Sequence, residues 1–214
     1  MIAARSLFVL LGALAFSAPS TDAATSYRVT CVYNNAKCSG GKIKLRQFLP
    51  NNACENADCA PFSNKELTAF GTFHTCTTDP VSDSAKLLKG QSYVLVENYG
   101  SGCSGDPKDA VAVVGDGLCV PNGDGKSSYK VTIADDNAVT WMQFTDTLCQ
   151  SNATTKSFKS SEVDRKTCVG DTMKVLVVNT KNPSPATSSS SSSPSMSAIL
   201  AANVLASVAW ALSA

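Results

Sequence analysis

Apolar and polar residues alternate with a period of two along much of the chain between positions 27 and 178. Apolar side chains take every second position in the segments 27–33, 42–46 and 129–133, which is the pattern of a strand with one buried face. The segments 111–114 and 175–178 are short and apolar throughout, as is typical of central strands. The pattern therefore predicts a chain built mainly from strands.

Turn residues separate these strands at short intervals. Asp135-Asp136-Asn137 leads from one strand back into the segment 139–144 and predicts a hairpin. One short helix is expected at Ser84 to Leu88, after Pro80. Short strands with regular turns predict an all-β, disulfide-rich, sandwich-like fold.

A cysteine-bounded stretch occurs twice and organises the sequence. Cys38-Ser-Gly is followed by thirteen residues and Cys54, and Cys103-Ser-Gly by thirteen residues and Cys119. Each copy follows a strand-like run, Tyr27 to Tyr33 in the first and Tyr93 to Tyr99 in the second. We interpret this as an internal repeat, with a first unit at 24–91 and a second at 92–182.

The first 23 residues have the pattern of a secretory signal peptide. Arg5 precedes an apolar core from Leu7 to Phe16, and small and polar residues follow. Cleavage is expected after Ala23, because Thr21 and Ala23 are small enough for the positions that the peptidase reads. The mature protein is then expected to begin near Ala24 and to lie outside the cell.

The C-terminal region predicts a glycosylphosphatidylinositol (GPI) anchor. Residues 183–195 are almost entirely Ser, Pro, Thr and Ala, a composition that forms no packed structure and predicts a stalk. The segment 196–214 is apolar and uncharged, and a polar spacer ahead of such a tail is the signal for GPI attachment and removal of the tail. The expected attachment residue is Ser189, with Ser188 and Ser190 as alternatives. A retained tail anchor is the competing interpretation.

Nine cysteines, all after position 30, predict disulfides formed in an oxidising compartment. If the repeat sets the pairing, Cys38 bonds to Cys54 and Cys103 to Cys119, and two further bonds join Cys59 to Cys76 and Cys149 to Cys168. Many other pairings remain open, because sequence alone does not determine connectivity. Cys31 is left over and is expected to be a buried thiol, since its counterpart in the second unit is Val96; an intermolecular bond or a reactive thiol is the alternative.

Short motifs in the second half resemble a known family. The runs 93–99, 103–105 and 117–119, and the segment 141–146 before Cys149, resemble a cysteine-rich extracellular domain of oomycete secreted and surface proteins. The same domain occurs in the ectodomains of oomycete tyrosine-kinase-like receptor kinases, but this chain has no kinase domain. The resemblance covers most of residues 27–178 and implies an all-β, disulfide-bonded ectodomain without known catalytic residues.

The residue inventory argues against an enzyme. His74 is the sole histidine and lies in a strand-like run, so we interpret it as structural rather than as a general base. The acidic pairs Asp135/Asp136 and Asp106/Asp109 fall in turns, although a carboxylate-dependent glycan-active enzyme stays an alternative. No cysteine–histidine spacing typical of zinc, no phosphate-binding glycine loop and no nucleic-acid motif occurs, so we expect no metal, no cofactor and no nucleic-acid partner.

Three cations form the candidate binding row. Lys42, Lys44 and Arg46 take alternate positions, so on a regular strand they would point to one side and face acidic glycans. The alternative is an amphipathic strand whose lysines discourage edge pairing. The sequon Asn152-Ala-Thr predicts N-glycosylation in an exposed loop.

Together these features predict a GPI-anchored cell-surface protein on the outer leaflet of the plasma membrane. Its ectodomain is expected to be non-catalytic and to bind acidic glycans or components of a host or cell-wall surface. A secreted effector or inhibitor released from the surface is the alternative function.

Overall fold

The computed structural model describes residues 25–182. The predicted signal peptide, Ser/Pro-rich stalk, attachment residue Ser189 and apolar tail lie outside the described residues. The described chain is mostly β, with one α-helix, two short 3-10 helices and four disulfides, so the all-β, disulfide-rich, sandwich-like prediction is confirmed.

The elements follow one another in the order β1 (Tyr27–Tyr33), β2 (Ile43–Pro50), β3 (Ala57–Pro61), η1 (Lys65–Leu67), β4 (Gly71–Thr77), α1 (Pro80–Leu87), β5 (Tyr93–Asn98), β6 (Asp109–Val114), β7 (Asp116–Pro121), β8 (Ser128–Ile133), β9 (Val139–Phe144), β10 (Ala153–Phe158), η2 (Ser160–Glu162) and β11 (Met173–Val178).

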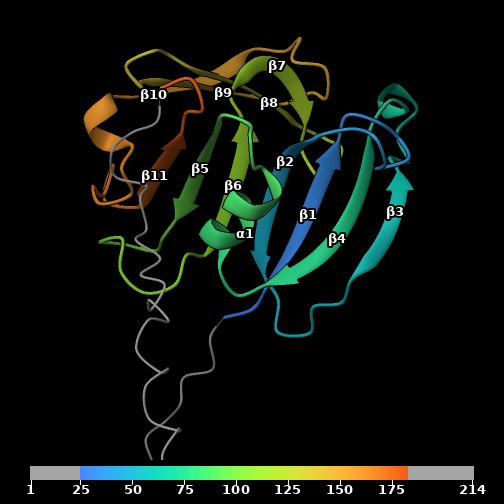
Figure 1. The fold of residues 1–214 in the computed structure, drawn as a ribbon, viewed down its shortest axis with the longest axis horizontal. Coiled ribbons are helices and arrows are strands. Elements are labelled where there is room, and N and C mark those ends of the chain that lie inside the picture. Colours follow the sequence, from blue (N-terminus) through green and yellow to red (C-terminus); the bar gives the residue numbers. More distant parts are fainter. Residues whose placement is uncertain (1–24, 183–214) are drawn as a thin grey trace, which may run out of the picture.

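The strands form two antiparallel sheets (Figure 1). The large sheet has seven strands in the order β11-β5-β6-β2-β1-β4-β3, and the small sheet has four in the order β10-β9-β8-β7. The predicted hairpin is β8–β9, with Ile133 opposite Val139. All strand pairs are antiparallel, which allows short connections between neighbours.

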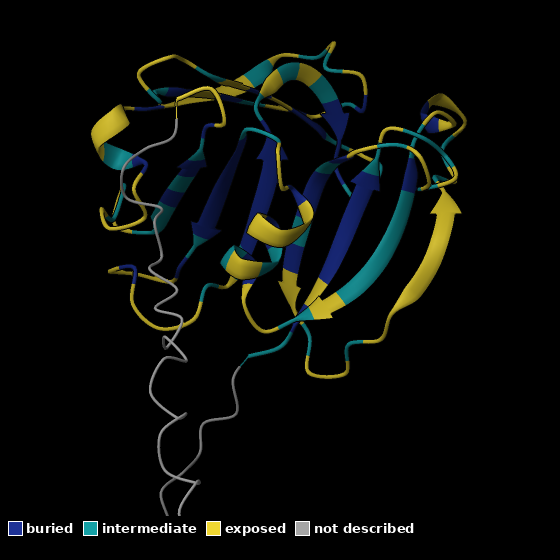
Figure 2. Cartoon of the chain, in the orientation of Figure 1, coloured by how far each residue is buried: buried dark blue, intermediate teal, exposed yellow. Residues whose placement is uncertain are grey.

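The large sheet is apolar on both faces and has a core on each. One core lies between the two sheets and includes Leu45, Val94 and Trp141. The other lies on the opposite face and includes Phe48 and Leu95, with Leu88 just beyond the helix packed into it. Figure 2 shows the central strands of this sheet as the most buried part of the fold.

The helix α1 covers only part of the second face. Asp79 caps it by accepting hydrogen bonds from the backbone amides of Val81 and Ser82, and Pro80 occupies its first turn. The helix was predicted at Ser84 to Leu88, and the Asp79 cap explains why it begins earlier. Eight residues give a helix about 12 Å long. Seven strands about 4.8 Å apart span roughly 29 Å, so much of the sheet extends past the helix.

The two units of the repeat form hairpins with the same register. Cys31 lies opposite Arg46 in β1–β2, and 65 residues further along both strands Val96 lies opposite Val111 in β5–β6. The hairpins face opposite ways, because Cys31 packs in the core under α1 and Val96 packs between the sheets. Both hairpins belong to the large sheet, so strands from both units form one continuous structure.

The outer edge of β11 is covered by the segment that precedes it. The amide of Val177 donates to the carbonyl of Val163 at 3.0 Å, and the amide of Arg165 donates to the carbonyl of Val175 at 2.8 Å. The Arg165 guanidinium also forms two hydrogen bonds, at 2.7 and 2.8 Å, to the carboxylate of the buried Glu97 on β5. Pairing of this kind protects a sheet edge from other chains.

All eight cysteines predicted to form disulfides are bonded, but the predicted pairing is wrong. The bonds join Cys38 to Cys59, Cys54 to Cys76, Cys103 to Cys168, and Cys119 to Cys149. The repeat misleads because each sixteen-residue step spans the second strand of a hairpin, β2 or β6, so one cysteine precedes that strand and the other follows it. Strand β2 alone extends roughly 25 Å, whereas disulfide-bonded cysteines have Cα atoms about 6 Å apart.

Removing the disulfide that closes the longest loop should destabilise the fold more than removing one that closes a short loop. The Cys103–Cys168 bond closes a separation of 65 residues and the Cys38–Cys59 bond one of 21. The chain-entropy estimate is about 4 kcal/mol for the first and about 3 kcal/mol for the second. We predict that the pair of substitutions Cys103→Ala and Cys168→Ala lowers the free energy of unfolding by about 1 kcal/mol more than Cys38→Ala and Cys59→Ala.

Urea unfolding without reductant measures this difference, and mass spectrometry confirms that the three other bonds are retained in each variant. An equal or larger loss for the Cys38–Cys59 variant would contradict the loop-length argument.

Candidate functional site

A groove lies on the α1 face of the large sheet, where the helix does not reach. It has a volume of about 580 Å³ and is formed by Tyr33 at the end of β1, the turn at Lys37 and Cys38, residues 56–59, and residues 73–75 of β4. Figure 1 shows α1 in front of the central strands, with β4 and β3 to one side of it. The groove therefore occupies the part of this face that has no helix over it.

Two aromatic rings form the apolar part of the groove. The ring centroids of Tyr33 and Phe73 are 5.5 Å apart, with 52° between the ring planes. Phe73 lies opposite Cys31 and Tyr33 opposite Gly71, so the two rings are diagonal neighbours on β1 and β4. Both rings are half-buried and pack against the core under α1, which fixes one side of each ring and leaves the other to the groove.

The Cys38–Cys59 disulfide forms one wall. It links the turn after β1 to the edge strand β3, and Cys59 Sγ lies 3.5 Å from the carbonyl oxygen of Ala36. The turn crosses close over Gly71, where a Cβ atom would lie 2.7 Å from the Asn35 carbonyl oxygen and 2.9 Å from Cys38 Sγ. Only glycine fits at this crossing, so the wall is held by covalent geometry and close backbone contact.

The polar rim of the groove is formally neutral. Asn56, Asp58 and Lys37 are exposed, and the aspartate and lysine charges balance. His74 Nδ1 lies 3.1 Å from Thr30 Oγ1, and burial together with the nearby Arg28 lowers the pKa of His74. A lowered pKa keeps the imidazole uncharged at neutral pH, and its hydrogen bond agrees with the structural role predicted for it.

The predicted row of Lys42, Lys44 and Arg46 is not present on the surface, and this prediction was wrong. A register shift between Val32 and Tyr33, opposite these residues, breaks the alternation of side chains along β2. Lys44 forms an ion pair with Asp116 of β7 at 2.5 Å. Arg46 is fully buried on the α1 face, which leaves Lys42 as the one exposed cation of the three.

Arg46 fastens α1 to the sheet. Its Nη2 donates to the Asp83 carboxylate on the helix, and its guanidinium lies 5.5 Å from the centroid of the Phe48 ring. Among the described residues, Arg46 Nε and Nη1 and the hydroxyl of Ser84 have no hydrogen-bond partner. A buried guanidinium requires a compensating charge, so Asp83 ties the position of the helix to this arginine.

Cys31 is free and buried beside Arg46, as predicted for a small apolar residue. Burial raises the pKa of the Cys31 thiol to about 12, an effect that the nearby Arg46 partly offsets. The thiol is thus fully protonated at physiological pH, and its nucleophilic form is suppressed.

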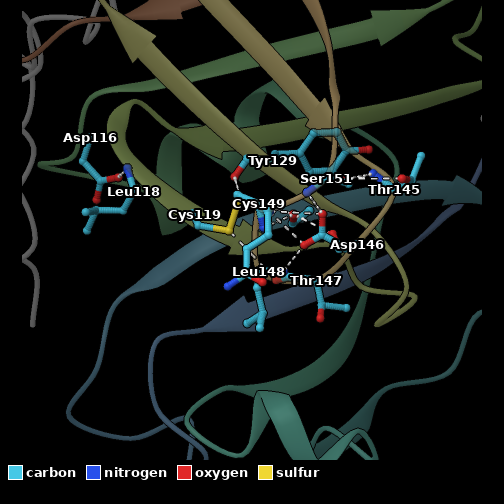
Figure 3. Close-up of a disulfide and its surroundings, with 12 residues drawn as sticks. Asp116, Leu118, Cys119, Tyr129, Thr145, Asp146, Thr147, Leu148, Cys149 and Ser151 are labelled. Carbon is cyan, nitrogen blue, oxygen red and sulfur yellow. Dashed lines mark hydrogen bonds between the residues drawn. A yellow bond between two sulfur atoms is a disulfide. The ribbon is translucent and has the colours of Figure 1, made fainter.

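The motif that carries the family resemblance has structural roles. Trp141 packs against Tyr129 with ring centroids 5.3 Å apart. Figure 3 shows Asp146 at the centre of the turn that holds the Cys119–Cys149 disulfide. Hydrogen bonds from Ser151 and from the backbone amides of Gln150 and Leu148 hold the pKa of Asp146 well below its ordinary value. The Asp146 carboxylate therefore shapes the turn.

The predicted acidic pairs make structural hydrogen bonds, but Asp109, which was expected in a turn, is the first residue of β6. Asp136 accepts a hydrogen bond from the backbone amide of Ala138, and Asp106 accepts one from the hydroxyl of Thr25. Asp109 accepts a hydrogen bond from Asn98 on the neighbouring strand. Within residues 25–182, no three His, Cys, Asp or Glu side chains are close enough to hold a metal ion.

Asn152 is exposed and precedes the edge strand β10, in agreement with the loop predicted for the sequon. Glycosylation of this asparagine stays a prediction. Figure 1 shows β10 at the opposite side of the molecule from β3, so a glycan there would leave the groove open.

Breaking the Arg46–Asp83 pair from one side should destabilise the fold more than replacing both partners. The substitution Asp83→Ala leaves the Arg46 charge buried without a partner, and we expect a loss of about 3 kcal/mol in the free energy of unfolding. The double substitution Arg46→Met and Asp83→Leu removes both charges and should recover at least half of that loss. Urea unfolding of the three proteins measures this.

Lys44→Ala is the control, because it breaks the partly exposed pair with Asp116 and should cost below about 1 kcal/mol. If Asp83→Ala costs no more than this control, Arg46 does not depend on Asp83.

Comparison with known proteins returned nothing: no protein-family model, no curated protein and no solved structure matches the chain. The resemblance to the oomycete ectodomains thus stays a prediction from short motifs. In the part of the chain that the structure describes, no helix is long and apolar enough to cross a bilayer.

Proposed function

We propose that the protein is a GPI-anchored cell-surface protein whose ectodomain binds a ligand without transforming it. The anchor is inferred from the sequence of residues 183–214, and the binding role from the groove beside α1. Four disulfides in the described domain are consistent with an extracellular protein.

The observation that carries the proposal is the groove itself. Its aromatic part is fixed by the core and its wall by a disulfide, so it is shaped before any ligand arrives. A preformed site binds with a smaller entropic cost than one that must be ordered. The titratable side chains on its face of the sheet are Tyr33, Lys37 and Asp58, whereas the His74 side chain lies on the opposite face, beside Thr30. His74 is engaged by Thr30, and burial raises the pKa of Tyr33, so neither is suited to proton transfer at neutral pH.

The position of the groove suits presentation from a stalk. The last described residues follow β11, where Asn182 Nδ2 donates to the carbonyl of Asp135 at 2.7 Å. Strands β11 and β3 are the two edges of the large sheet, so the groove and the start of the proposed stalk lie at opposite margins. The groove therefore lies away from the last described residues, where the proposed stalk begins.

The anchor is tested on cells that express the full chain with an epitope tag after Ala24. We expect surface labelling that a phosphatidylinositol-specific phospholipase C removes, with the tagged protein recovered in the medium. The matched control replaces residues 196–214 by a single transmembrane helix of another protein, and its labelling should resist the enzyme.

Labelling that persists under conditions that release a known GPI-anchored protein would contradict the lipid anchor. Recovery of all tagged protein in the medium without enzyme would favour the secreted alternative.

A further inference from the structure

The groove combines an apolar aromatic surface with a polar rim that has no net charge, and this combination indicates a class of ligand. We propose that it binds a short segment of neutral glycan, with a sugar ring packed on Tyr33 and Phe73 and hydroxyls bound at the rim. This assignment rests on the proposed binding role and names its ligand.

The aromatic pair provides the apolar contact. A pyranose ring has an apolar face of C–H groups, and aromatic faces pack well against such surfaces. Tyr33 and Phe73 are tilted by 52° rather than stacked, so together they offer an angled surface instead of a slot for a flat heterocycle. The rings are held from behind by the core under α1, and a ligand therefore need not order them.

The rim provides both kinds of hydrogen-bonding partner. Sugar hydroxyls donate and accept, and they are best matched where donors and acceptors lie together. The Asn56 amide offers both, the Asp58 carboxylate accepts, and the Lys37 ammonium donates; all three line the groove and are exposed. A volume of about 580 Å³ falls within the range of about 300–1,000 Å³ that is typical of small-ligand sites.

The net charge of the groove favours a neutral glycan over an acidic one as the ligand. A site for polyanions needs several unpaired cations, and such binding weakens steeply with salt. Here the charge of Lys37 is balanced by that of Asp58, and the His74 side chain lies on the opposite face of the sheet, beside Thr30. Arg46, which the sequence placed in a basic row, is buried and paired with Asp83.

The adjacent sheet edge argues against an extended peptide as the ligand. Strand β3 is short, ends in Pro61 and has a register irregularity between Ala57 and Ala60. Proline and irregular register interrupt the regular row of backbone groups on which strand addition depends. A ligand bound through side chains fits this margin better than one bound through backbone pairing.

The test uses the full chain in the form in which expressing cells process it. The purified protein is applied to arrayed neutral oligosaccharides, namely hexamers of β-1,3-glucan, β-1,4-glucan, mannan, galactan and chitin. Heparin and polygalacturonate serve as acidic probes, and an extended heptapeptide library as the peptide probe. We expect saturable binding to at least one neutral hexamer, with an affinity that changes less than twofold between 0.05 and 0.5 M NaCl.

Variants assign the binding to the groove. Asn56→Ala and Asp58→Ala alter exposed side chains that a folded domain tolerates, and each should weaken binding by fivefold or more. Phe73→Ala should weaken it by tenfold or more, whereas Tyr33→Phe keeps the ring and should retain binding within threefold. Lys42→Ala changes an exposed cation outside the lining of the groove and should have no effect.

Absence of binding to every neutral hexamer, or binding that Asn56→Ala, Asp58→Ala and Phe73→Ala leave unchanged, would overturn the assignment. Selective, salt-sensitive binding of the acidic probes, or binding of the peptide probe alone, would overturn it as well. Release by phospholipase is measured in a separate experiment. A negative glycan result therefore does not contradict the anchor, and a negative anchor result does not change the interpretation of glycan binding.

Discussion

The large sheet carries apolar side chains on both faces, and both faces have to be kept from water. The small sheet covers one face and contributes Val131 and Trp141 to a shared core. The other face has only α1 above it, and a helix of about 12 Å is too short to cover seven strands. The groove beside α1 follows from this mismatch, because the sheet extends beyond its cover with Tyr33 and Phe73 half-buried at the margin.

Disulfides attach the segments at the margins of the large sheet to the rest of the fold. Strand β3 is exposed along its whole length and makes no contribution to either core. Bonds from Cys38 to Cys59 and from Cys54 to Cys76 tie it to the turn after β1 and tie the segment before it to β4. At the other edge, Cys103–Cys168 fixes the segment that covers β11. These three disulfides thus lie at the two margins of the large sheet.

Local patterns in the sequence predicted most of the strands but not β3, β7 or β10, which carry few buried apolar side chains. Non-local pairing was not available from such patterns. The alternation in 27–33 and the apolar run at 111–114 predicted β1 and β6, because side-chain periodicity depends on neighbours in the chain. The disulfide pairing and the groove require knowing that β4 lies beside β1, which no local pattern states. The basic row failed because one register shift puts Lys44 and Arg46 on opposite faces of the large sheet, where Lys44 meets Asp116 of the small sheet and Arg46 meets Asp83 of α1. The burial of Arg46 could not be predicted from its own charge, because it depends on pairing with Asp83. Asp83 lies on a helix that begins earlier than predicted because of the Asp79 cap.

Disulfide mapping of the protein purified from expressing cells tests the central claim, which is that covalent bonds at the margin of a partly covered sheet build the groove. The protein is unfolded at acidic pH without reductant so that the buried free thiol can be blocked, and proteolysis followed by mass spectrometry then identifies the bonded peptides. The account predicts one peptide pair joined through Cys38 and Cys59, another through Cys54 and Cys76, and a single blocked thiol at Cys31. A bond between Cys38 and Cys54 would contradict it, because β3 would then not be held against the turn after β1 and the groove would lose its wall.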